Sequence, residues 1–299
     1  MVGPRPKAVF SKPPLPLNEQ VALLLKRGMI IDKPDEAAEF LGEVNYYRFS
    51  GYALYFEGFE NQERTHVFKA GTRFEDVRRL YEFDSALRSL FFDAIEPVEI
   101  AFRTAVCLES SLYYNNSHWY QDQTIFTERF NYKKFLSFCK DEVAGSRELF
   151  IESYLAHYSA PALPPGWMLT EILTLGKWSL MYASLKERIL RKHISDRFDC
   201  SERELKSWMH GITFLRNLCA HHSRLWNRSF PIRVLIRNDW DNVLSRPDRA
   251  GVFIPLLFHL HNQLSGDSRI EGKLRSLKTS FPEIDLDQIG LMAESPLFN

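Results

Sequence analysis

The sequence has no excess of charge of one sign, no long hydrophobic run and few cysteines. Its 299 residues include 38 Lys and Arg against 38 Asp and Glu, so the net charge is zero. This balance argues against a nonspecific polyelectrolyte binder of the histone type. No run of eighteen apolar residues occurs, which argues against a transmembrane helix and a membrane partner. We therefore expect a soluble protein located in the cytoplasm.

Several sequence motifs that mark metal, nucleotide and hydrolase sites are also absent. The four cysteines form no C-x-x-C pair, so neither a structural zinc site nor a disulfide framework is expected. The sequence contains no P-loop, no G-x-G-x-x-G, no G-x-S-x-G and no H-E-x-x-H motif. His221 and His222 are adjacent and would point about 100° apart on a helix, which is unsuited to a shared metal. We expect no metal and no cofactor.

Apolar residues recur at helical spacing along most of the chain, which predicts an all-α fold. The expected helices cover about 18–27, 35–44, 74–114, 131–143, 146–158, 168–193, 202–222, 250–264 and 269–279. Pro97 should kink or divide the helix over 74–114, and residues 45–52 are as consistent with a third short helix as with irregular structure. No reliable strand pair is expected. The prolines of residues 1–17 favour an extended arm. We expect a helical and aromatic segment over 18–70, a helical bundle over 71–240 and a C-terminal helical extension over 241–299.

The positive charge is concentrated in one segment. Residues 186–238 contain twelve Lys and Arg but only five Asp and Glu, and no acidic residue occurs between Lys206 and Asn238. A neutral chain with one basic segment is suited to bind an anion locally. Within this segment, Arg224 and Arg228 are i and i+4, and Arg233 and Arg237 extend the basic stretch.

The string Arg216-Asn217-Leu218-Cys219-Ala220-His221-His222 lies at the end of an expected helix. Asn217 and His221 share one helical face, whereas Arg216 and His221 are about 140° apart and converge only because Arg is long. An imidazole, with an unperturbed pKa near about 6.5, moves protons at neutral pH, and a guanidinium neutralises a phosphate. These groups suit metal-independent cleavage of RNA. The alternative is structural, because Arg and His near a helix end also cap carbonyls and complement the helix dipole.

The chain resembles the Abi-like family of bacterial abortive-infection proteins (AbiD/AbiF), which belongs to the HEPN superfamily of ribonucleases. The resemblance covers roughly residues 12–230 and rests on several motifs in order. They include Asn45-Tyr46-Tyr47-Arg48-Phe49-Ser50-Gly51-Tyr52, Leu80-Tyr81-Glu82-Phe83-Asp84 with Leu87-Arg88, Ala94-Ile95-Glu96 with Glu99 and Arg103, Trp167-Met168-Leu169-Thr170-Glu171, and the string from Arg216 to Arg228. It implies a HEPN-like helical bundle with additional N- and C-terminal helices.

The resemblance also implies an activity. Arg216 and His221 correspond to the catalytic residues of an R-x4-6-H motif, and Asn217 to their supporting residue. The implied function is a metal-independent endoribonuclease of phage defence or a toxin of a toxin–antitoxin pair. The alternative is a non-catalytic RNA-binding or regulatory module in complex with a small noncoding RNA.

The implied partners are an RNA substrate, a small noncoding RNA or an antitoxin, and a second copy of the chain. A homodimer is implied because the sites of this superfamily usually combine two motifs. We expect His222, Arg224, Arg228, Arg233 and Arg237 to bind RNA. Trp208 and Trp226 are expected to contribute to the dimer contact.

Overall fold

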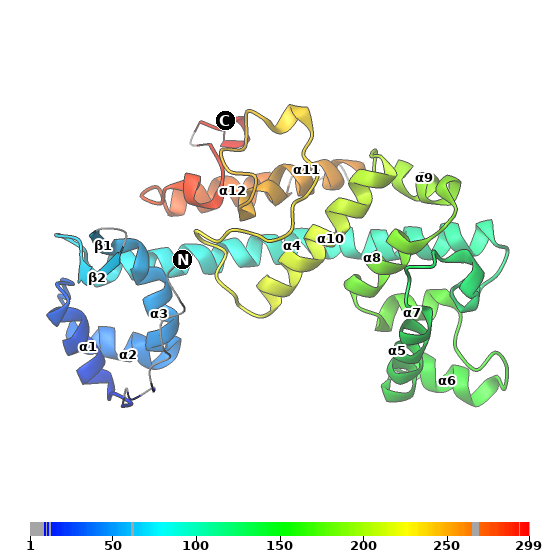
Figure 1. Cartoon of the computed structure of the whole chain (residues 1–299), viewed down its shortest axis with the longest axis horizontal. Coiled ribbons are helices and arrows are strands. Elements are labelled where there is room, and N and C mark those ends of the chain that lie inside the picture. Colours follow the sequence, from blue (N-terminus) through cyan, green and yellow to red (C-terminus); the bar gives the residue numbers. More distant parts are fainter. Residues whose placement is uncertain are drawn as a thin grey trace, which may run out of the picture. The chain divides into compact units, whose positions relative to one another are not determined.

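The computed structural model describes residues 9, 11, 13–60, 63–264, 269–292 and 294–298. The arm expected over 1–17 lies largely outside these residues. The chain divides into two compact units, Met1–Phe83 and Asp84–Asn299, and each is described by itself. The all-α class is confirmed, since the described residues form twelve α-helices and a single two-stranded sheet (Figure 1).

The first unit is built around aromatic side chains. Its helices are α1 (Leu17–Lys26), α2 (Pro34–Val44), α3 (Tyr46–Ala53) and the beginning of α4 (Phe74–Tyr113). Phe49 of α3 stacks on Phe74 with ring centroids 4.7 Å apart, and Phe40 packs edge-on against both. The third short helix is therefore present, because its aromatic residues bury one side against α2 and α4.

The expectation of no strand pair was wrong. Strands β1 (Glu57–Glu60) and β2 (Glu63–Phe68) pair antiparallel, with Glu57 opposite Phe68 and Phe59 opposite Arg64. The register is irregular between Glu57 and Phe59. Such an irregularity shifts side chains between the two faces of the sheet, so the alternation that marks a strand is obscured in the sequence.

The second unit consists of the rest of α4 and eight further helices. These are α5 (Tyr132–Gly145), α6 (Leu149–His157), α7 (Gly166–Ile172), α8 (Leu175–Ser184), α9 (Arg188–Asp196), α10 (Glu202–Ala220), α11 (Phe253–Leu264) and α12 (Arg269–Ser280). Figure 1 shows α10 crossing α4, while α11 and α12 run beside α4. Gly211 permits the crowding around α10, because a Cβ there would lie 2.3 Å from Val234 Cγ1.

The single helix expected over 168–193 is instead three helices, α7, α8 and α9. The chain is extended at Leu173 and Thr174 and again at Leu185, where it forms an antiparallel bridge with Phe126. The Ser184 carbonyl accepts a hydrogen bond from the Thr127 amide at 2.8 Å. Tertiary pairing with the segment 125–127 thus interrupts a helical pattern that the local sequence would have continued.

Helix α4 is not divided at Pro97, which lies exposed within it. Proline removes one backbone donor and crowds the carbonyl four residues earlier. Residues Ala94, Ile95 and Val98 are buried on either side of the proline. The His261 ring of α11 lies 2.7 Å from the Ala94 carbonyl oxygen, one residue after the Asp93 carbonyl that has no amide donor at Pro97.

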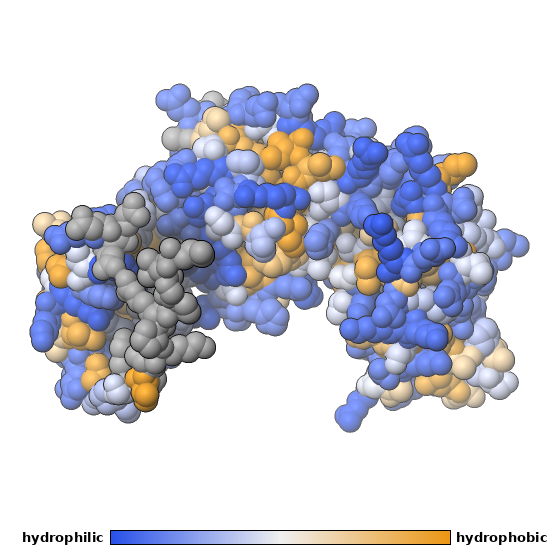
Figure 2. All heavy atoms as spheres, viewed as in Figure 1, coloured by the Kyte–Doolittle hydropathy of each residue, from blue (hydrophilic) through white to orange (hydrophobic). Residues whose placement is uncertain are grey.

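Hydrophilic side chains cover most of the visible face of the second unit, with separate hydrophobic patches between them (Figure 2). Within the described parts of the chain, no helix has the length and hydropathy that a bilayer-spanning segment requires.

Candidate functional site

The candidate site lies at the C-terminal end of α10. The helix begins with a capping box in which the Ser201 and Glu204 side chains satisfy each other's backbone amides. Its buried face contains the apolar residues Trp208, Ile212, Leu215, Leu218 and Cys219. This packing fixes α10 and leaves its polar residues on the remaining faces.

The last turn of α10 closes with a Schellman motif. The Ser223 amide donates to the Leu218 carbonyl at 2.8 Å, and the His222 amide donates to the Cys219 carbonyl at 3.0 Å. His222 occupies the left-handed position of this motif, with φ of 51°. His221 caps the helix, and the side chains of Asn217, His221 and His222 are all exposed. The helix end therefore presents an amide and two imidazoles to solvent.

Arg216 points toward α4. Its Nε lies 3.6 Å from Glu99 Oε2, and its guanidinium carbon lies 5.9 Å from the centre of the Phe92 ring. Glu99 is buried and also accepts from Arg103, whose Nη1 donates to the Thr170 carbonyl at 3.1 Å. Arg216 remains 37% exposed. Glu99 thus fixes the direction of Arg216 while leaving part of its guanidinium accessible to an anion.

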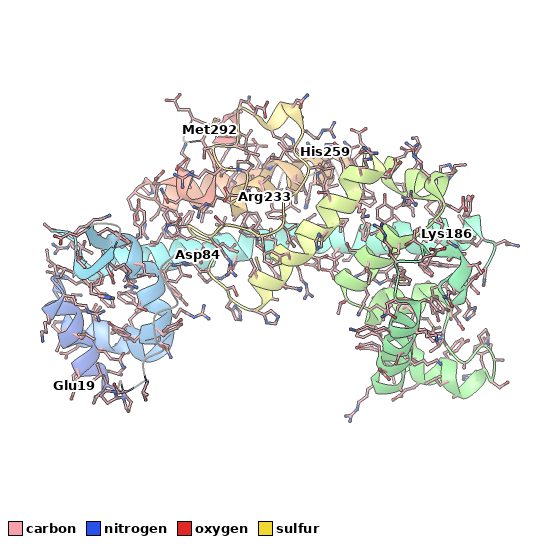
Figure 3. All side chains as sticks on the ribbon, in the orientation of Figure 1. Glu19, Asp84, Lys186, Arg233, His259 and Met292 are labelled. Atoms are coloured by element: carbon pink, nitrogen blue, oxygen red, sulfur yellow. The ribbon has the colours of Figure 1, made fainter. Side chains whose placement is uncertain are left out.

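A second carboxylate on α4 holds the loop after α10. Asp84 is fully buried and accepts from the Trp226 amide at 2.7 Å and from the Leu225 amide at 3.1 Å. It also accepts from the Arg88 guanidinium, one turn later on α4. Asp84 is labelled in Figure 3, where it lies on α4. The loop that follows the histidines is therefore anchored by hydrogen bonds to a charged group.

The five residues expected to bind RNA are not gathered in one place. His222 belongs to the helix end, and Arg228 Nη1 donates to the Arg224 carbonyl at 3.4 Å, with both arginines partly buried. Arg233, labelled in Figure 3, lies 4.0 Å from Asp248. Arg237 Nη1 donates to the Asp199 carbonyl at 3.3 Å, and its Nε lies 3.8 Å from Asp239. Intramolecular partners thus engage the last two arginines.

The expectation that Trp208 and Trp226 would contact a second copy was wrong. Both side chains are buried within the chain itself. Trp208 stacks on Trp240 with ring centroids 5.7 Å apart, and its Nε1 donates to the Leu235 carbonyl at 2.8 Å. Large aromatic side chains gain most when the chain's own core covers them, so they are unavailable to a partner.

Two further groups near the helix end bear on its chemistry. Burial raises the pKa of the Cys219 thiol to about 12, so it stays protonated at neutral pH and is unsuited to act as a nucleophile. Among the residues that the structure describes, no three His, Cys, Asp or Glu side chains are grouped to hold a metal ion. The groups placed for chemistry are thus the imidazoles, the Asn217 amide and the Arg216 guanidinium.

Sequence reasoning missed the roles of Glu99 and Asp84. Charged residues near Glu99 in the sequence are consistent with inter-helix ion pairs, but they do not indicate Arg216 as the partner. A signal for Asp84 exists, since Asp84 and Arg88 are i and i+4 among the buried residues Phe83, Leu87 and Phe91. A charged pair inside an apolar stripe indicates a buried interaction, but it does not indicate the partner.

Comparison with known families gives a match that covers most of the site. A model of the Abi-like protein family matches residues 39–227, which include α4, α10 and the helix end with Arg216 and His221. A search of curated proteins and a search of solved structures each returned no match. The matched range covers well over half of the 299 residues, and it ends just after the loop that Asp84 anchors. The chain belongs to the Abi-like protein family.

Proposed function

We propose that this protein is a metal-independent endoribonuclease of the HEPN type that acts in phage defence, either by abortive infection or as a toxin of a toxin–antitoxin pair. Membership of the Abi-like family supports the biological setting. The observation that carries the chemistry is the end of α10, where His221 is exposed and Arg216 is held by Glu99. The site consists of Arg216, Asn217 and His221.

The proposed reaction needs two proton transfers and one stabilised phosphate. The His221 imidazole takes the proton of an RNA 2′-hydroxyl, and the 2′ oxygen attacks the adjacent phosphorus. The bond from phosphorus to the 5′ oxygen breaks, and that oxygen receives a proton from a second imidazole. Arg216 neutralises the charge that develops on the phosphate. The products are a 2′,3′-cyclic phosphate and a 5′-hydroxyl.

A second copy of the chain would supply the second imidazole. Arg216 and His221 are about 140° apart around a helix, which is a poor arrangement for gripping one phosphate from both sides. Two-fold symmetry is the commonest symmetry of oligomers. A two-fold axis beside the helix end would bring two copies of each residue around one cleft. The proposed enzyme is therefore a homodimer with a composite site.

The test is to incubate the purified chain with total RNA in EDTA and to identify the product ends. We expect cleavage to persist in EDTA and to leave 2′,3′-cyclic phosphates. His221→Ala should abolish cleavage and leave the circular dichroism spectrum unchanged, because a substitution at an exposed position usually changes stability by less than about 0.5 kcal/mol.

His193→Ala provides the matched control, since His193 is an exposed histidine on α9. This variant should cleave RNA at the rate of the original chain. Full activity of His221→Ala would exclude the proposed site. RNA that is bound but never cleaved, with or without EDTA, would favour a regulatory RNA-binding module instead.

A further inference from the structure

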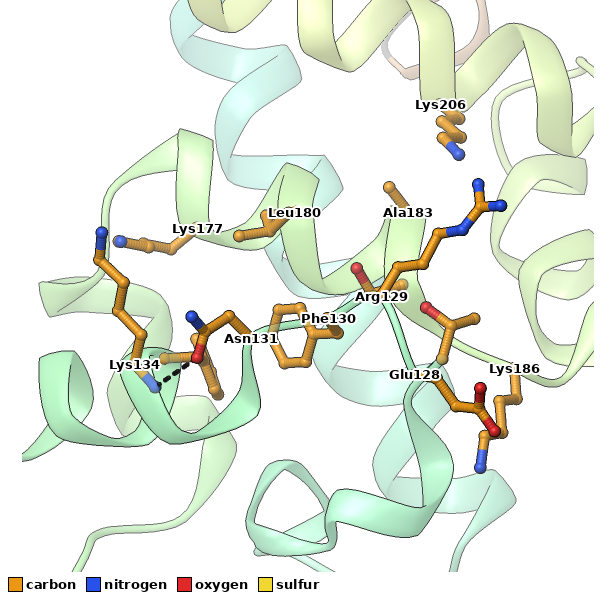
Figure 4. A pocket seen from close by; sticks show the side chains of 13 residues that line it. Glu128, Arg129, Phe130, Asn131, Lys134, Lys177, Leu180, Ala183, Lys186 and Lys206 are labelled. Carbon is orange, nitrogen blue, oxygen red and sulfur yellow. Dashed lines mark hydrogen bonds between the residues drawn. The ribbon is translucent and has the colours of Figure 1, made fainter.

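A basic groove lies within the second unit, beside α10 but outside the proposed catalytic residues. Its volume is about 1010 Å³. It is lined by the segment 127–131, by α5, by α8 and by the start of α10 (Figure 4). The lining contains five cationic side chains, Arg129, Lys134, Lys177, Lys186 and Lys206, against one carboxylate, Glu128. Such a surplus in a concave surface attracts an anion strongly.

Among the described residues, the groove cations differ from several other basic residues of this unit in forming no ion pair with a carboxylate. Arg188, Lys192, Arg197, Arg233 and Arg237 each form an ion pair with a nearby Asp or Glu. Within the described part of the chain, no ion pair involves Arg129, Lys134, Lys177 or Lys206. Lys177 instead lies 3.9 Å above the Phe138 ring, and Lys186 donates to the Thr124 carbonyl. These contacts hold two of the cations in place without neutralising them.

The groove leads toward the proposed catalytic residues. A second hollow of about 660 Å³ shares Leu180, Ala183 and Lys206 with the groove and extends along α10 to His210 and Thr213. Lys206, His210, Thr213 and Asn217 follow one another at intervals of three or four residues, so they lie on one face of α10. Asn217 is one turn, about 6 Å, beyond Thr213. A chain-like ligand lying along this face would reach the end of α10.

The lining suits one strand of RNA. Its cations lie around a partly apolar floor that includes Phe130 and Leu180, and Leu180 is 47% exposed. Proteins that hold single strands combine a cationic track for phosphates with apolar or aromatic surface for the bases. The groove has the size of a pocket for a small ligand, whereas double-stranded RNA is recognised over about 16 base pairs. A few nucleotides of one strand fit this volume.

We propose that this groove binds the phosphate backbone of single-stranded RNA and guides the strand along α10 to the catalytic residues. The proposal rests on the proposed function for the identity of the strand as substrate. It assigns the principal binding role to the cations at residues 129, 134, 177, 186 and 206 rather than to Arg233 and Arg237. The strand leaves the groove past His210 and meets Asn217 and His221 at the end of the helix.

The test measures binding of a labelled 12-nucleotide oligouridine to the whole chain carrying His221→Ala, over a range of salt concentrations. Adding Lys134→Gln, Lys177→Gln and Lys206→Gln should weaken binding at least about 10-fold. The slope of log affinity against log salt should become shallower by about 2, because each phosphate contact with a single strand contributes about 0.7. Circular dichroism of the triple variant serves to check that it is folded.

Lys133→Gln, Lys140→Gln and Arg147→Gln together form the matched control. These residues are exposed on or just after α5, carry the same charge and do not line the groove. The control should keep its affinity within about 2-fold and its salt slope unchanged. Equal losses in both triple variants would overturn the proposal, and so would equally groove-dependent binding of a duplex of the same length. Groove-dependent binding of oligoglutamate without binding of RNA would also overturn it, by assigning the groove to an acidic protein.

The same variants separate this proposal from the proposed function. If the chain with His221 intact does not cleave RNA but oligouridine binding depends on the groove lysines, the groove is supported and the nuclease is rejected. If the groove variant with His221 intact cleaves RNA with an unchanged KM, the groove is rejected and the nuclease stands.

Discussion

At the scale of single residues, the candidate site depends on how Arg216 is held. A free arginine side chain loses about 2 kcal/mol of rotamer entropy when it is fixed on a phosphate. The contact with Glu99 fixes part of that side chain before RNA binds. It involves the Nε atom of Arg216, which lies 3.6 Å from Glu99 Oε2. With Nε facing Glu99, the two Nη groups can form an end-on fork with phosphate oxygens. Glu99 is thus a positioning residue for Arg216.

Glu99→Gln is expected to lower the rate of RNA cleavage about 10-fold, equivalent to about 1.4 kcal/mol in the barrier, because the amide holds Arg216 less firmly. The loss should appear in kcat, with KM changed by less than about 2-fold, since ground-state binding by the groove is intact. Glu99→Asp should recover part of the rate because it keeps the charge. Steady-state kinetics on one RNA oligonucleotide provide the measurement.

Glu96→Gln is the control for this variant, because Glu96 is exposed on the same helix. It should leave both kcat and KM unchanged. If Glu99→Gln cleaves as fast as the original chain, Arg216 does not need its carboxylate partner and the positioning role is wrong. An equal loss in Glu96→Gln would indicate a general charge effect.

At the scale of elements, α4 and the loop after α10 are connected by Asp84. Residues 84 and 226 are far apart in the sequence, yet the Asp84 carboxylate accepts from two consecutive backbone amides of the loop. Buried amides without a partner would cost about 1–3 kcal/mol each. The loop that carries Arg224 and follows His222 is therefore held by a helix that supplies none of the proposed proton transfers.

Asp84→Ala is expected to reduce the free energy of unfolding by about 3–5 kcal/mol, because it removes the buried carboxylate that accepts from Arg88 and from two loop amides. Asp84→Asn should cost less, since its amide oxygen still accepts from the loop. Urea unfolding followed by circular dichroism measures both. Asp93→Ala is the matched control, as Asp93 is exposed on α4 and pairs with Lys273 at 2.5 Å. It should cost less than about 1 kcal/mol, and an equal cost for the two alanine variants would refute the anchoring role.

Hydrophobic periodicity predicted α4 and α10 because both are long and pack one face continuously. Hydrophobic periodicity predicted the wrong helix boundaries where tertiary contacts override the local pattern. The expected helix over 168–193 is broken by pairing of Leu185 with Phe126, and the division at Pro97 does not occur where α11 packs against α4. Both exceptions depend on residues more than fifty positions away, which no local pattern contains.

The residues of the candidate site also differ in whether the local sequence reveals them. Arg216, Asn217 and His221 are recognisable because seven consecutive residues carry them. Glu99 and Asp84 act from a different helix, so only the fold reveals their partners. The groove was missed for a related reason. Its cations at 129, 134 and 177 lie outside the basic segment 186–238, and charge counted along the chain does not reveal charge gathered in space.

At the scale of the whole molecule, the proposed site requires a second copy of the chain. Since Trp208 and Trp226 are buried, the contact must use other side chains. Phe92 and Ile100 on α4 are 44% and 57% exposed, and Phe92 lies beside Arg216. Contiguous exposed apolar patches are typical of interaction surfaces, and a dimer contact would bury these side chains. We expect these two residues to lie at the dimer contact.

Mixing the original chain with His221→Ala distinguishes a composite site from one contained in a single chain. If both copies contribute an imidazole, only dimers of two original chains are fully active, and random exchange at equal amounts leaves about one quarter of them. Activity should therefore fall to about one quarter, while a single-chain site would leave one half. Mixing with His193→Ala, whose substitution lies on α9, should leave activity unchanged. Sedimentation equilibrium reports the mass at the assay concentration, and a monomer that cleaves RNA at the full rate would rule out the composite site.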